Sequence, residues 1–90
     1  MKKTGAIIKI EGKVQGVGFR YYTQQKAREL SIDGFVQNRP DGSVYVEAEG
    51  NEENLDAFIM WCHDGPGWAR VTNIMVQRTP PFGYNDFVIK

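Results

Sequence analysis

Cysteine and histidine are nearly absent from the chain, which has Cys62 and His63 as its only residues of these types. One cysteine cannot form an intramolecular disulfide, and these two side chains cannot supply most of the ligands of a metal site. A metal would therefore need carboxylate ligands. We expect Cys62 to belong to the core, and His63 to lie near a helix end, where an imidazolium would complement the dipole.

Long apolar runs are missing as well. The start of the chain has too few apolar residues for a secretory signal, and no stretch has the length of a membrane span. We therefore expect a soluble, cytoplasmic protein without a membrane partner. No linker, low-complexity tract or repeat interrupts the sequence, so residues 1–90 are expected to form one domain that is too small for a second substrate-binding lobe.

Net charge is also absent, because eleven Lys and Arg balance eleven Asp and Glu. This balance does not favour a nucleic-acid partner. The charges are nevertheless unevenly placed: residues 1–45 contain eight basic and four acidic side chains, and the remainder contains three and seven. The N-terminal half is therefore the better candidate for binding a small anion.

Strand and helix patterns follow one another along the chain. Period-two alternation of apolar residues indicates strands, and apolar residues three or four apart indicate helices. Asn51 can cap the second helix, and Gly65 can end it. The expected elements are a strand at 6–11, a helix at 20–30, a hairpin of strands at 34–38 and 43–49, a helix after Asn51, and strands at 69–77 and 86–89.

This order, β-α-β-β-α-β with a short extra strand, predicts an α+β fold. It is typical of the split βαβ, or ferredoxin-like, arrangement, an α/β sandwich in which two helices pack on one face of an antiparallel sheet. Many unrelated functions use this fold, so the function has to be inferred from the site.

The run Gly16-Val17-Gly18-Phe19-Arg20 lies between the first strand and the first helix. Closely spaced glycines let backbone amides surround an anion, and an arginine offers a planar fork of donors to phosphate oxygens. The run is neither a P-loop nor a dinucleotide fingerprint, because the further residues of those motifs are absent. By themselves the glycines could form only a tight connection, but Arg20 favours a phosphate site.

Asn38 precedes the turn at 39–42, where an asparagine is ordinarily a turn-forming residue. Together with the glycine run it forms a pattern that resembles the acylphosphatase family. The resemblance covers nearly the whole chain and rests on residues 12–20 and 34–38, Gly42, Val44, Gly50, Gly65-Pro66, Ala69 and Val71.

The resemblance implies hydrolysis of acyl phosphates to a carboxylate and inorganic phosphate, without a metal or cofactor. It implies that Arg20 binds the phosphate and that Asn38 orients the attacking water. The residues whose amides would surround the phosphate are Gln15, Gly16, Val17, Gly18, Phe19 and Arg20. The chain departs from the commonest family pattern at three positions outside this set, namely Ser31, Gln37 and Lys90.

Two other functions share the element order. An RNA-recognition module would need a basic and aromatic consensus on its central strand, which residues 43–49 lack. A regulatory module that binds an acyl or carbamoyl phosphate without rapid turnover is the closer alternative. We favour a monomeric enzyme, because such modules often belong to larger proteins.

The remaining conspicuous side chains are expected to be structural. Aromatic residues of this kind could contribute to a surface for the acyl group, but packing is their more frequent role. Acidic residues could form a cation site, but at alternate strand positions or at a helix start they are usually solvated. The first expectation concerns Tyr21, Tyr22, Trp61 and Trp68, and the second concerns Glu47, Glu49, Glu52 and Glu53.

Overall fold

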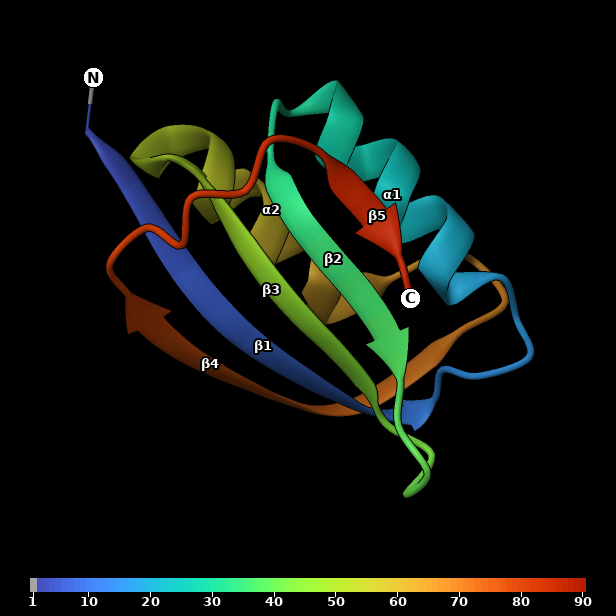
Figure 1. The fold of residues 1–90 in the computed structure, drawn as a ribbon. Helices are drawn as coiled ribbons and strands as arrows, with labels where there is room; N and C mark the ends of the chain where they lie inside the picture. The colour runs from blue at the N-terminus through green and yellow to red at the C-terminus, as the bar shows by residue number, and fades with distance from the viewer. Residues whose placement is uncertain (1) are drawn as a thin grey trace.

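The computed structural model describes residues 2–90 as a five-stranded sheet with two helices (Figure 1). No helix in this range is long and apolar enough to cross a membrane. The elements in chain order are β1 (Lys3–Lys13), α1 (Phe19–Glu29), β2 (Asp33–Asn38), β3 (Val44–Asn51), α2 (Glu52–Asp64), β4 (Arg70–Thr79) and β5 (Phe87–Ile89).

The sheet has the strand order β4-β1-β3-β2-β5. The first four strands pair antiparallel, as the sequence predicts, but β5 lies parallel to β2, with Gly34 opposite Phe87. The sheet is therefore mixed. The expected helix and strand order is confirmed, and the extra strand extends the sheet at the edge formed by β2 (Figure 1).

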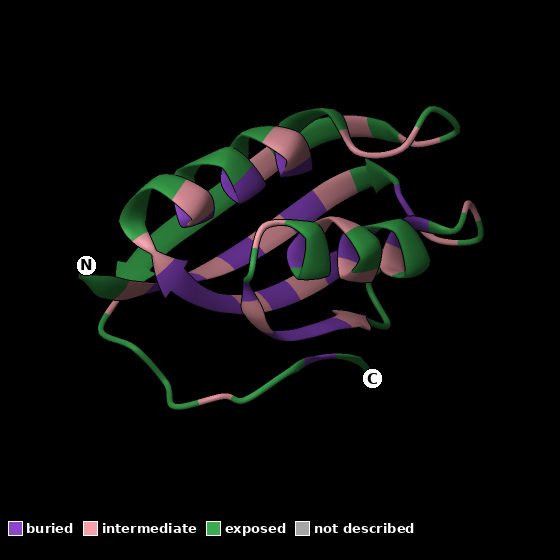
Figure 2. Cartoon of the chain, turned by 90° about the horizontal axis from the view of Figure 1, so that it is seen from above, coloured by how far each residue is buried: buried purple, intermediate pink, exposed green. Residues whose placement is uncertain are grey.

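Both helices cover the same face of the sheet, as Figure 2 shows. The alternation of strand side chains places Ala6, Ile8 and Ile10 on this face, where each is fully buried. The helices cover these strand side chains with residues of their own, such as Phe19 and Phe58, which are almost or wholly buried. The core thus lies between the helices and the sheet, and the outer faces of the helices are exposed.

The second helix forms as its local sequence predicts. The Asn51 side chain accepts a hydrogen bond from the backbone N–H of Asn54 at 2.8 Å, which is the expected cap. Cys62 is fully buried, and burial raises the pKa of its thiol. His63 is in the last turn and its Nδ1 lies 3.0 Å from the Ile59 oxygen, in agreement with structural roles for both residues.

Glu49 is the main exception to the expectation of solvated acids. Its side chain is fully buried on β3, where its carboxylate accepts hydrogen bonds from the backbone N–H groups of Phe82, Gly83 and Tyr84. Lys3 Nζ lies 4.0 Å from the same carboxylate. Glu49 therefore holds the connection between β4 and β5 against the sheet, so the expectation of a solvated side chain is wrong.

Glu47 is half-buried on the same face and anchors the same connection. Its carboxylate accepts a hydrogen bond of 2.6 Å from each of the Tyr45 and Tyr84 hydroxyls. The hydrogen bond to Glu47 and burial raise the pKa of Tyr84 to about 12. The pKa of Tyr45 also rises to about 12, through burial and then the same carboxylate. Glu52 and Glu53 are exposed, as expected.

Candidate active site

A hollow of about 220 Å³ lies at the N-terminal end of α1. It brings together Arg20, from the first turn of α1, and Asn38, the last residue of β2. The other residues around it are Val14, Gly16, Gly18, Phe19, Tyr21 and Ile89. Five of the seven residues predicted to form the site therefore line one hollow.

The glycines give the loop its shape. Gly16 and Gly18 have φ angles of 75° and 78°, in the left-handed region that a side chain disfavours. A Cβ on Gly16 would meet no atom within 4 Å. The preference for glycine at this position is therefore explained by backbone conformation and not by crowding. The loop turns sharply here from β1 into α1, and its backbone borders the hollow.

Within residues 2–90, the N-terminus of α1 has neither a side-chain cap nor an acidic residue in its first turn. Gly18 occupies the capping position, has no side chain to accept from the first amides, and is followed by no acidic residue in the first turn. In contrast, α2 has an asparagine cap and two acidic residues at the same place. The free amides and the helix dipole make the α1 terminus a suitable place for an anion.

Arg20 places a permanent positive charge at this end of the helix. Its Nη1 donates a hydrogen bond of 3.1 Å to the backbone oxygen of Lys90, which follows β5. The side chain is partly exposed, so its remaining guanidinium donors can reach a ligand in the hollow. The contact with Lys90 was not predicted, because nothing local in the sequence links the two residues.

Asn38 points to the same side of the sheet as the helices. In β2 the side chains alternate, so Asn38 shares a face with the buried Val36, and Gln37 lies on the opposite face. Within residues 2–90 the Asn38 amide makes no hydrogen bond to another residue. Its oxygen and its N–H groups are therefore available to a molecule in the hollow.

Gln15 and Val17 do not line the hollow, although both belong to the predicted loop. The Gln15 side chain turns toward the hairpin, where its Nε2 donates to the backbone oxygens of Arg39 at 2.7 Å and Ser43 at 2.9 Å. Val17 packs against the core. That their amides contact phosphate stays a prediction, and Gln15 has a structural role that the sequence did not indicate.

Not all of the aromatic residues pack as expected. Tyr21 and Tyr22 are 55% and 46% exposed and pack edge to face against each other, with ring centroids 5.2 Å apart. Trp68 is 82% exposed, so the expectation of packing is wrong for this residue. Trp61 is partly buried and lies 5.8 Å from Phe19, measured between ring centroids, which agrees with packing. Tyr21 also borders the hollow, beside Arg20.

Possible metal ligands are not gathered anywhere in the described part of the chain. Among residues 2–90 no group of three or more His, Cys, Asp or Glu side chains is placed to hold a metal ion. The positive groups at the hollow are the Arg20 guanidinium and the N-terminus of α1.

The fold and the hollow define a small α+β protein of the ferredoxin-like class with a potential anion site at a helix N-terminus. The family model for acylphosphatase matches residues 6–89. The acylphosphatase of Thermotoga maritima is 51% identical over 83 residues, or 92% of each chain. That of Thermococcus kodakarensis is 44% identical over 89 residues, covering 99% of this chain and 98% of the other.

A solved structure agrees with these relatives. The crystal structure of acylphosphatase from Bacillus subtilis matches with a TM-score of 0.93 and 38% identity, over 97% of this chain and 98% of the other. The chain therefore belongs to the acylphosphatase family and is a hydrolase of acyl phosphates. The family and the activity expected from the sequence are confirmed.

Proposed function

We propose that the phosphoryl group of the substrate binds in the hollow between Arg20 and Asn38. The observation that supports this proposal is that the two side chains meet at the one end of α1 that has neither a cap nor an acid. Arg20 and the amides of residues 15–20 would surround the phosphate oxygens, and the helix dipole would add to their attraction.

The reaction places modest demands on such a site. Water attacks phosphorus, the bond from phosphorus to the acyl oxygen breaks, and the electron pair leaves with the carboxylate. The conjugate acid of this carboxylate has a pKa of about 4, so the group leaves without a proton. The products are the carboxylate and inorganic phosphate, and no general acid is required.

Asn38 would orient the water. Its amide oxygen can accept a hydrogen bond from water, but an amide is too weakly basic to remove a proton at neutral pH. The transition state for phosphoryl transfer is loose in most analyses, so orientation and charge stabilisation provide most of the rate enhancement. An arginine, a set of amides and one asparagine can supply both without a metal ion or cofactor.

The first test is the reaction itself. We expect the purified protein to hydrolyse benzoyl phosphate at an unchanged rate in excess chelator, and to leave ordinary phosphate monoesters intact because their poorer leaving group needs an acid. Release of inorganic phosphate measures both reactions. Loss of activity in chelator that returns with an added divalent cation would contradict metal independence.

Replacement of Asn38 by alanine tests its role. We expect turnover to fall about 10- to 100-fold, because a poorly oriented nucleophile loses much of the benefit of proximity. Phosphate, measured as a product inhibitor, should bind nearly as well as before. Gln37→Ala is the matched control, because Gln37 is the neighbouring residue on the opposite face of β2. Equal turnover of the two variants would refute the proposed role.

The enzyme is further proposed to act as a monomer in the cytoplasm, with the small acyl phosphate as its partner. A regulatory module that binds an acyl phosphate without turnover would show saturable phosphate binding but no release of phosphate from benzoyl phosphate.

A further inference from the structure

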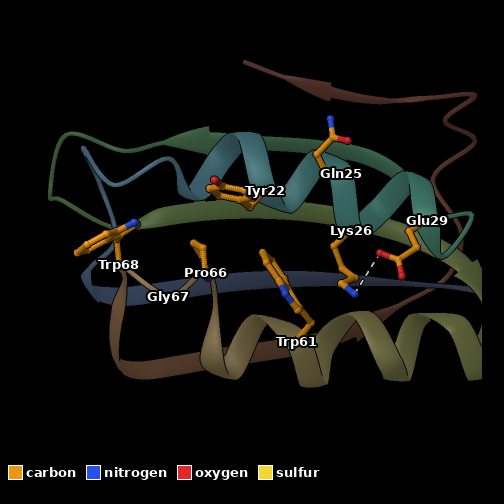
Figure 3. Close-up of a pocket in the computed structure, with 8 residues that line it drawn as sticks. All are labelled: Tyr22, Gln25, Lys26, Glu29, Trp61, Pro66, Gly67 and Trp68. Carbon is orange, nitrogen blue, oxygen red and sulfur yellow. Dashed lines mark ion pairs between the residues drawn. The ribbon is translucent and has the colours of Figure 1, made fainter.

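A second hollow, larger than the one at Arg20, lies between α1 and α2. It is a groove of about 620 Å³, which the proposed reaction does not use. Its walls come from α1, from α2 and from the segment after α2 (Figure 3). A hollow of this size is large enough to hold a small molecule or a short peptide segment.

Three aromatic rings line this groove, and no two of them touch. Tyr22 contacts Tyr21, Trp61 contacts Phe19, and Trp68 has no ring partner among residues 2–90. Figure 3 shows Trp61 extending from α2 toward α1 and Trp68 at the opposite end of the groove from Glu29. The three rings therefore do not stack on one another, and Pro66, which also lines the groove, lies between Trp68 and Trp61 in the view of Figure 3.

The polar groups of these rings are hydrogen-bond donors without partners among residues 2–90. Within residues 2–90 no side-chain hydrogen bond involves the indole N–H of Trp61, the indole N–H of Trp68 or the hydroxyl of Tyr22. Both indoles can only donate. The rings thus combine apolar faces with donors, and a fitting ligand would present apolar rings and carbonyl acceptors.

Charge in the groove is already neutralised. Lys26 Nζ lies 3.1 Å from the Glu29 carboxylate, and both residues line the groove. The pair occupies the only carboxylate there and leaves no net charge, which favours an uncharged ligand over an anion such as an acyl phosphate. Nucleic acid is disfavoured for the same reason, because its affinity depends on unpaired basic residues.

The shape of the groove fits an extended segment. Tyr22 and Glu29 are seven residues apart on α1, or about 10 Å along the helix axis, and Trp68 extends the groove at the Tyr22 end (Figure 3). A polyproline II helix rises about 3.1 Å per residue, so three or four residues span this distance. Grooves lined by aromatic residues are the features by which proteins bind such segments.

We propose that this groove binds a proline-rich peptide segment in the polyproline II conformation. Proline rings of the ligand pack against Trp68, Tyr22 and Trp61, and the peptide carbonyls accept hydrogen bonds from the indole and hydroxyl donors. A run of prolines offers carbonyl acceptors and no N–H donors, which matches a groove that has free donors and a neutralised carboxylate.

The two tryptophans provide the measurement. They are the only tryptophans of the chain and both line the groove, so all tryptophan emission reports on it. The intact protein is titrated with a short proline oligomer that has blocked ends. The tryptophan emission should shift with increasing oligomer concentration until binding is saturated, and calorimetry should give the same affinity. A glycine-serine peptide of equal length should have no such effect.

Variants separate this binding from catalysis. Trp68→Ala should lower the affinity for the proline oligomer about 30-fold. Tyr22→Phe keeps the ring and removes the hydroxyl, and it should lower this affinity about fivefold. The matched control is Met60→Ala, on α2 and outside the groove, where the residue is 68% exposed. Benzoyl phosphate hydrolysis should be unchanged in the Trp68→Ala variant.

Three results would overturn the proposal. They are an emission that does not respond to the proline oligomer, an equal affinity in the Trp68→Ala variant, and equal binding of the glycine-serine peptide. A fourth is specific to the substrate: if Trp68→Ala raises KM for benzoyl phosphate and not for acetyl phosphate, the groove binds the acyl group instead. None of these outcomes depends on the roles of Arg20 or Asn38.

Discussion

Replacement of Arg20 by glutamine is expected to lower turnover of an acyl phosphate about 100- to 1,000-fold, the usual effect of removing one preorganised donor from an active site. Arg20 is the only side chain around the hollow with a permanent charge. In the proposed mechanism, charge on the transferring phosphoryl group is therefore stabilised mainly by this guanidinium and by backbone amides. Steady-state phosphate release measures the effect, and inorganic phosphate should also inhibit the variant less strongly.

Two further variants make the experiment specific. Arg20→Lys keeps the charge but loses the planar fork, so its turnover should lie between those of the wild type and of the glutamine variant. Arg28→Gln removes a charge on the exposed side of the same helix, where Arg28 lies 3.7 Å from Asp86, and should leave turnover unchanged. Wild-type turnover in folded Arg20→Gln protein would refute the proposed role.

Replacement of Glu49 by alanine is expected to destabilise the fold by about 2 to 4 kcal/mol. The substitution leaves three backbone N–H groups without their acceptor, and each partner lost in a buried position costs about 1 to 3 kcal/mol. Water can reach part of the exposed connection between β4 and β5, which keeps the total below the sum of three losses. Urea unfolding measures the free energy, and the melting temperature should fall by about 10 °C or more.

The control for this substitution is Glu53→Gln, an exposed acid in the first turn of α2. It should cost no more than about 1 kcal/mol, the value of one favourable charge at a helix N-terminus. If Glu49→Ala and Glu53→Gln unfold at the same urea concentration, the carboxylate of Glu49 does not anchor the connection. Glu49→Gln should be intermediate, because one acceptor oxygen remains.

The local sequence was sufficient to predict those structural features that depend on interactions between neighbouring residues. Asn51 caps the helix that begins at the next residue, and the apolar spacing of Leu55, Phe58 and Ile59 correctly predicts the buried face of α2. The glycine loop and Arg20 could likewise be recognised, because their conformation and charge depend on neighbouring residues. Local patterns thus predicted the elements and the region of the site.

The features that the sequence did not reveal depend on distant residues. Alternation in β3 places Glu49 on the open face, where solvent is the ordinary expectation, and only the later segment at residues 82–84 covers it. The parallel alignment of β5 and the contact of Arg20 with Lys90 also depend on residues that are distant in the sequence. No local pattern indicates which strand such a short terminal segment will join.

The exposed aromatic residues show a second limit of prediction from sequence, which concerns the burial of side chains. Tyr22 and Trp68 have the residue types of a core, and burial is the usual outcome for such side chains. The sheet offers one face to two helices, and Phe19 and Phe58 already fill the space beneath them. Composition cannot show that this space is occupied, so the groove between the helices was found only in the folded chain.

The side chain of Gln15 has a consequence for the cost of each catalytic cycle. Its one amide nitrogen joins the loop between β1 and α1 to both sides of the hairpin turn that follows Asn38. In the proposed site, the conformational entropy of aligning this loop with Asn38 is thus lost once, when the chain folds, and not again at every encounter with substrate. An enzyme arranged in this way can act on a small, short-lived substrate without closing a lid over it.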